Sequence, residues 1–202
     1  MKQACNPLFE CIVLTAIDAP ASFYTPLAWC QRNFHAGACE LKVTMIKPIL
    51  LLGFGNPSRG DDALGVLLLE RIPAACLHTV ELLTDFQLQI EHALDLKQRQ
   101  LVLFADASVA NTQPIHFSQL QPVCDNSYTT HAMNPAAVMQ VYSDIEKTAP
   151  PPCFLLTMQA VRFELGEGLS ETAENSLRAA VVLVEKLFAQ PSLSAWQANI
   201  RA

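Results

Sequence analysis

An uninterrupted apolar run, Pro48 to Phe54, constrains the fold more than any other feature of this sequence. A strand that carries no polar side chain must be covered on both faces, which is typical of a parallel sheet packed between helices. Residues 63–72 then place leucines at helical spacing, and Pro73 ends this predicted helix. Strand, loop and helix together predict the first βα unit of an α/β domain.

The same alternation continues to residue 188. Asn134 before Pro135 and Ser170 before Glu171 are typical helix starts, because their side chains accept hydrogen bonds from free backbone N–H groups. The pattern predicts a single-domain α/β fold with a doubly wound, mostly parallel sheet and helices on both faces. Ligands of such folds bind at the carboxyl ends of the strands. The predicted strands are 48–54, 79–83, 100–105, 115–121 and 153–160, and the predicted helices are 63–72, 88–97, 135–146 and 171–188.

The domain is predicted to begin at about Met45. Residues 1–44 show no helical or strand periodicity, so we interpret them as an N-terminal extension that is poorly ordered or outside the core fold. An equally weighted interpretation is that translation starts at Met45. The domain itself is predicted to span 45–190, and residues 191–202 are interpreted as a C-terminal tail.

Composition excludes several classes of partner. The 13 Lys and Arg against 19 Asp and Glu give a net charge of −6, and no basic run is present that could bind a row of phosphates. Nucleic acid is therefore not an expected partner. No apolar run approaches the roughly 18 residues of a membrane span. The 7 cysteines include no Cys-x-x-Cys pair, which favours reduced thiols and a cytoplasmic protein.

Three loops carry polar residues suited to chemistry. Asp61 and Asp62 precede the first helix, Asp106 ends the strand 100–105, and His131 precedes Asn134. We expect Asp62, Asp106 and His131 at one edge of the sheet, where two carboxylates and an imidazole suit a divalent metal with open coordination positions. Taken singly, each has another interpretation: a helix cap, a loop hydrogen bond or a surface histidine.

Phosphate-binding interpretations of the loop 53–65 fail. A dinucleotide fingerprint needs glycine where Ser58 stands, and a phosphate-binding loop needs lysine where Asp61 follows Gly60. No Gly-x-Ser-x-Gly nucleophile motif occurs either.

Three motifs, in order, resemble those of the nickel-iron hydrogenase maturation endopeptidases. These are Gly53-Phe54-Gly55-Asn56-Pro57 with Asp61-Asp62-Ala63-Leu64-Gly65, the strand Leu101 to Val109, and His131 ahead of a helix. The resemblance spans about Ile46 to Leu187. It implies a peptidase that removes the C-terminal extension of a hydrogenase large-subunit precursor after nickel insertion. Asp62, Asp106 and His131 would be ligands of nickel that the precursor supplies, so nickel would not be a resident cofactor.

The resemblance also implies lesser roles and has two departures. Some members carry Glu where this chain has Asp62, which keeps the carboxylate but shortens its reach, so the role should survive. Many members carry an Asp-Gly-Gly-Thr turn where this chain has Thr84 to Gln89, and the segment with Glu91 and His92 resembles a subgroup and bears on which large subunit is accepted. His92 is interpreted as a surface or substrate-contacting residue, and the enzyme is expected to be a monomer. Candidate helpers are Asp61 and Asp85, which are equally interpreted as cap and turn residues, and candidate substrate contacts are Gly55, Asn56, Gln87 and His92.

Two alternatives stay open. One is a non-catalytic α/β module that binds a small ligand or a metal at the same edge of the sheet. The other is an independent metallohydrolase with a resident ion of its own.

Overall fold

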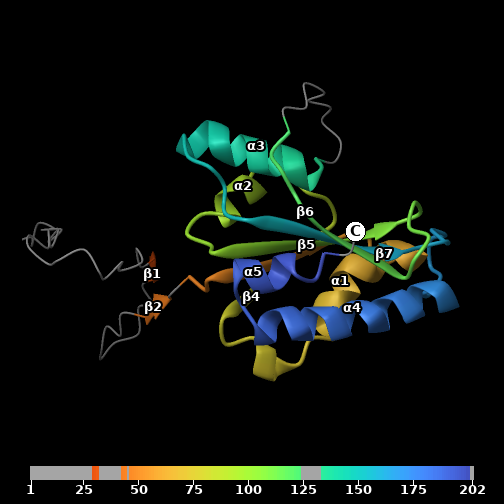
Figure 1. Ribbon diagram of the computed structural model, residues 1–202. Coiled ribbons are helices and arrows are strands. Elements are labelled where there is room, and N and C mark those ends of the chain that lie inside the picture. Colours follow the sequence, from red (N-terminus) through yellow and green to blue (C-terminus); the bar gives the residue numbers. More distant parts are fainter. Residues whose placement is uncertain (1–28, 32–41, 45, 124–132, 201–202) are drawn as a thin grey trace, which may run out of the picture.

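The computed structural model describes residues 29–31, 42–44, 46–123 and 133–200, and its centre is a five-stranded sheet (Figure 1). The strand order is β4-β3-β5-β7-β6, in which β6 alone runs antiparallel to its neighbour. This arrangement confirms the predicted α/β fold with a mostly parallel sheet. The strands are β3 (Ile49–Phe54), β4 (Val80–Asp85), β5 (Leu101–Ser108), β6 (Ile115–Gln119) and β7 (Cys153–Gln159).

Helices cover both faces of this sheet (Figure 1). One face packs against α1 (Leu64–Glu70) and α4 (Glu171–Ala189), and the opposite face packs against α2 (His92–Asp95) and α3 (Pro135–Glu146). Short 3-10 turns, η1 (Gly60–Ala63) and η2 (Ala74–Cys76), precede and follow α1. No helix in the described part of the chain is long and apolar enough to cross a membrane.

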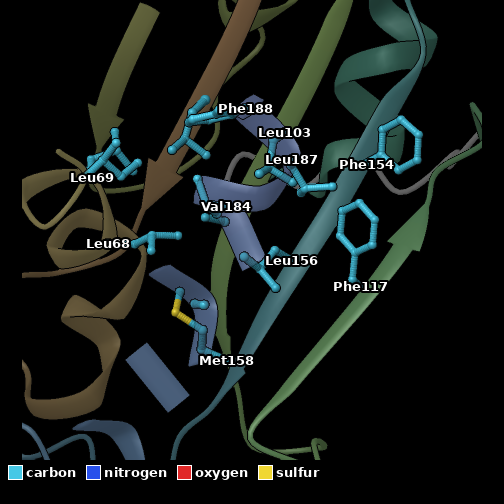
Figure 2. Packing of buried hydrophobic residues seen from close by; sticks show 14 of the residues in the cluster. Leu68, Leu69, Leu103, Phe117, Phe154, Leu156, Met158, Val184, Leu187 and Phe188 are labelled. Atoms are coloured by element: carbon cyan, nitrogen blue, oxygen red, sulfur yellow. The ribbon is translucent and has the colours of Figure 1, made fainter. Parts of the chain in front are cut away.

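The larger core cluster fills the α1–α4 face (Figure 2). Side chains of α4 such as Val184 and Leu187 meet Leu103 of β5 and Leu156 of β7, all of them buried. Alternate strand residues such as Leu52 and Phe104 face the other way, into the smaller cluster beneath α2 and α3. This strict alternation explains why β3 has to be apolar at every position.

Both predicted helix caps are confirmed. The Asn134 side-chain oxygen accepts a hydrogen bond from the Ala137 N–H at 2.8 Å, and Pro135 is the first helical residue of α3. Ser170 Oγ accepts one from the Ala173 N–H at 3.1 Å at the start of α4. These caps fix the two helix starts that lie on either side of β7.

The chain after Pro191 differs from the prediction of a tail. It forms α5 (Leu193–Gln197), and Trp196 is fully buried in the larger cluster, where its ring meets Phe154 edge-on at 5.2 Å. The indole N–H donates to the Leu187 carbonyl at 3.0 Å, so its one polar atom is satisfied. The core fold therefore extends beyond residue 190.

Two other segments differ from expectation. The predicted helix 88–97 is reduced to the single turn of α2, with irregular chain and a turn before it and another turn at residues 96–98. Within the predicted extension, β1 (Trp29–Gln31) and β2 (Lys42–Thr44) pair antiparallel as a separate two-stranded sheet. Residues 1–28 and 32–41 lie outside the described part, so the predicted disorder of the extension stays a prediction.

Candidate functional site

The loop after β3 holds Asp62 in a fixed orientation. Gly55 has a φ of 138°, and a Cβ there would lie 2.0 Å from the Asp62 carbonyl oxygen, so no other residue fits. Its N–H donates to the Asp85 carbonyl at 3.1 Å, which ties the loop to the end of β4. The Asn56 N–H donates to Asp62 Oδ2 at 3.1 Å. The predicted contacts Gly55 and Asn56 therefore shape the loop around Asp62.

Close packing of α1 places this loop against β5. A Cβ on Gly65 would lie 2.3 Å from the Phe54 carbonyl oxygen and 2.7 Å from that of Ala105, so the start of α1 rests directly on the ends of β3 and β5. Asp106 is the residue after Ala105. The glycine thus brings the turn that carries Asp62 up to the strand that carries Asp106.

Asp106 is a partly buried carboxyl group whose ionisation is disfavoured. Burial is the main cause that raises its pKa, to about 6, and the negative charge of Asp62 raises it further. The Ala107 N–H, which donates to Asp106 Oδ1 at 2.7 Å, partly offsets both effects. Two carboxylates that repel each other at the edge of a sheet form a place that favours a cation. The structure therefore brings together two of the three predicted ligands.

The third predicted ligand, His131, lies outside the described residues, so its position stays a prediction. What the structure describes is the start of the following helix, where the Met133 N–H donates to the Leu88 carbonyl at 3.1 Å. Within the described part of the chain, no three His, Cys, Asp or Glu side chains gather into a metal site. The described residues thus supply a carboxylate pair.

Asp61 has a structural role and is fully buried. Its carboxylate accepts hydrogen bonds from the N–H groups of Val161, Arg162 and Ser170 and from Ser170 Oγ, at 2.7 to 2.9 Å. Burial acts to raise its pKa, but these hydrogen bonds outweigh burial and hold the pKa below its usual value. Asp61 therefore ties the β3–α1 loop to the loop after β7, which favours its interpretation as a structural residue over that of a catalytic helper.

The interpretation of His92 as a surface residue is wrong. Only 4% of it is exposed, and its Nδ1 accepts a hydrogen bond from the Gln89 N–H at 2.8 Å. A nitrogen that accepts carries no proton, so the ring proton lies on Nε2, which faces Asp85 Oδ2 at 3.3 Å. The pair folds the segment after β4 into a compact turn. Burial leaves His92 little surface for a substrate.

Asp85 lies next to the carboxylate pair in the sheet. It pairs with Phe54 of β3, and its side chain leaves the strand on the α2–α3 face, two residues after Leu83. Asp106, two residues after Phe104, leaves on the same face. Asp85 also accepts from the Phe86 N–H at 2.6 Å, so both of its oxygens are engaged. Gln87 is exposed, and its predicted substrate contact stays a prediction.

The loop after β7 is the part of the site that the sequence did not indicate. The Arg59 Nε donates to the Phe163 carbonyl at 2.9 Å, and the Gly166 N–H donates to the Ser58 carbonyl at 2.8 Å. These bonds join residues about a hundred positions apart, and no motif marks them. A separate groove of about 1010 Å³ lies between β6 and α4, and none of the predicted site residues lines it.

Solved structures with a similar fold include hydrogenase maturation proteases. HybD, a hydrogenase maturating endopeptidase from Escherichia coli, is 23% identical, with a TM-score of 0.55 over 71% of this chain and 93% of that one. An endopeptidase from Escherichia coli solved in solution is 23% identical, with a TM-score of 0.52 over 76% of this chain and 94% of that one. The maturation protease HycI from Thermococcus kodakarensis is 24% identical, with a TM-score of 0.50 over 69% of this chain and 91% of that one.

This chain has the fold of a hydrogenase maturation protease. The identities are too low for more than the fold to follow from these matches. No protein-family model matches the sequence, and no curated protein does. The likeness of the fold agrees with the resemblance of the short motifs in the sequence.

Proposed function

We propose that this protein is an endopeptidase that removes the C-terminal extension of a nickel-iron hydrogenase large-subunit precursor after nickel insertion. One observation carries the proposal: Asp62 and Asp106 form a carboxylate pair at the carboxyl ends of β3 and β5, in a protein with this fold. Parallel α/β sheets place ligand sites at this edge. The proposal makes nickel part of the substrate.

In the proposed mechanism, Asp62 and Asp106 bind the nickel that the precursor presents. Asp62 is held by the Asn56 N–H and Asp106 by the Ala107 N–H, so both carboxylates are oriented before the substrate arrives. Carboxylate oxygens and imidazole are both nickel ligands in proteins, and His131 would complete the set. Cation binding also offsets the repulsion between the two carboxylates, so a precursor without nickel would bind less well.

Cleavage would follow from the same contact. A divalent metal polarises a neighbouring carbonyl or lowers the pKa of bound water toward about 7, so an activated serine or cysteine is not needed. The residues of this chain would position the metal and the scissile segment together. Nickel would then serve both to recognise the precursor and to accelerate its cleavage. This is why the proposal requires the precursor to be loaded before it is trimmed.

The test is an electrophoretic processing assay with the large-subunit precursor, prepared with and without nickel. Wild-type protein should trim only the loaded form. Asp62→Ala, Asp106→Ala and His131→Ala should each slow trimming by at least about a hundredfold, because each removes a metal contact. Asp144→Ala, which removes an exposed carboxylate on α3, is the matched control and should trim normally.

Normal trimming by all three site variants would refute the site assignment. Absence of trimming by wild type in either form, with nickel binding by the protein alone, would favour a module that binds a metal without catalysis. Metal analysis of the purified protein distinguishes the proposed function from a further alternative, an independent metallohydrolase. Such an enzyme would retain a stoichiometric metal ion of its own after purification.

A further inference from the structure

Exposed apolar side chains gather at the edge of the sheet that carries Asp62 and Asp106. Phe86 directly follows β4, Val109 directly follows β5, and Val161 is the second residue after β7. Leu165 belongs to the loop that the Gly166 N–H ties to Ser58. These four residues are 55% to 77% exposed, and we call them the apolar rim. Single exposed apolar residues are common, whereas several at one edge indicate an interaction surface.

The strand ends place the apolar rim around the carboxylate pair. In the sheet, Phe54 of β3 lies beside Asp85 of β4, and Gly53 lies beside Ala105 of β5. Phe86 follows Asp85, so it lies on the β4 side of the loop after β3. On the other side, β5 and β7 continue to Ser108 and Gln159, roughly 7 Å beyond the level of Asp106. Val109 and Val161 extend from these longer strands. The carboxylates thus lie between apolar side chains on two sides.

The charges at this edge indicate what could cover it. Arg59 donates to the Phe163 carbonyl of the loop after β7, and Arg162 lies 3.4 Å from Glu167 within that loop, so both nearby cations are already engaged. Among the described residues, no Lys or Arg forms an ion pair with Asp62 or Asp106. A partner that complements the edge must present a positive centre surrounded by apolar surface. A small hydrated ion would meet the carboxylates but would leave the rim exposed.

We infer that the apolar rim is the docking surface for the protein substrate, which presents its metal to Asp62 and Asp106 and covers the rim with apolar residues. The inference rests on the proposed function and deepens it, because it assigns recognition of the protein to residues other than the carboxylates. His92 is a positioning residue for this surface: its bond to Asp85 fixes the turn from which Phe86 projects. Metal sensing and protein docking are therefore separate contributions.

The experiment compares the double variant Phe86→Ser, Leu165→Ser with wild type and with Val182→Ser. Val182 is 67% exposed on α4, where it lines the separate groove between β6 and α4 and is not part of the apolar rim, so this substitution makes the same chemical change outside the rim. With the nickel-loaded precursor, the double variant should raise KM by at least about tenfold and leave kcat within about twofold. Val182→Ser should change neither. Unchanged thermal unfolding of all three proteins shows that the fold is intact.

Direct binding of the uncleaved precursor keeps the docking inference separate from the proposed function. If wild type binds the precursor without trimming it and the double variant binds at least about tenfold more weakly, peptidase activity is refuted while the docking surface stands. If the double variant and Val182→Ser behave alike in both assays, or if wild type does not bind, the docking surface is refuted. A wild-type dimer that the double variant dissolves would also overturn it, because the rim would then cover a second copy of this chain.

Discussion

Replacing Asp106 by asparagine should make the protein more stable at neutral pH. Asparagine keeps the shape of the side chain and an oxygen that accepts from the Ala107 N–H, but it removes the charge. A rise of the Asp106 pKa from 3.8 to about 6 corresponds to roughly 3 kcal/mol against folding once the carboxyl is ionised. Because Asp106 is partly exposed, solvent screens part of this, and we expect a gain of about 1 to 3 kcal/mol.

The pH dependence identifies the cause. Well below pH 3.8 both the folded and the unfolded wild type hold the proton, so the carboxyl makes no difference. As the pH rises from 3.8 to about 6 the unfolded state ionises first, and the wild type loses stability relative to Asp106→Asn. The advantage of the variant should therefore be complete above about pH 6 and nearly gone near pH 4.

Urea unfolding measures this directly. With a denaturant slope of about 2 kcal/mol per molar, the midpoint of the variant at pH 7.5 should lie roughly 0.5 to 1.5 M above that of the wild type. Asp144→Asn, at an exposed position on α3, should shift the urea midpoint no more than surface substitutions usually do, both at pH 7.5 and near pH 4. Equal midpoints for wild type and Asp106→Asn at pH 7.5, or an equal gain at both pH values, would refute the reasoning. Under the proposed function the more stable variant also fails to trim.

Three further predictions concern the stability of the fold. Asp61→Ala should lower the free energy of unfolding by at least about 3 kcal/mol at pH 7, because it leaves the buried N–H of Ser170 and two partly buried N–H groups without an acceptor. Since its hydrogen bonds hold the pKa of Asp61 low, this contribution should fade as the pH falls through that value, and equal urea midpoints for wild type and variant would contradict it. Gly65→Ala should destabilise by more than about 2 kcal/mol in the same assay, since its Cβ would meet two backbone carbonyls; an unchanged midpoint would mean that α1 can shift freely. Trp196→Ala should lower stability by roughly 3 to 5 kcal/mol, which thermal unfolding would measure, whereas a neutral result would show that α5 is dispensable.

The sequence predicted those parts of the fold that local chemistry determines. The apolar run of β3 implied a covered parallel strand, and the capping oxygens of Asn134 and Ser170 marked two helix starts to the residue. The parts that depend on tertiary contacts outside the periodic patterns were not predicted. The burial of Trp196 depends on Phe154 and Leu187, and the burial of His92 depends on Asp85 and Gln89, and none of these pairs forms a periodic pattern.

The division of roles between Asp61 and Asp62 shows the same limit within one dipeptide. Both residues stand in the first turn before α1, and the sequence allowed either to be a helix cap, with Asp61 as a possible helper and Asp62 as the expected metal ligand. What separates them is the loop after β7, which brings three N–H groups and a hydroxyl onto Asp61, while among the described residues Asp62 meets only the Asn56 N–H and the field of Asp106. A carboxylate with four donors is saturated and stabilises the fold. A carboxylate with one donor and a like-charged neighbour retains capacity for a cation, and this is the physical reason to assign metal recognition to Asp62.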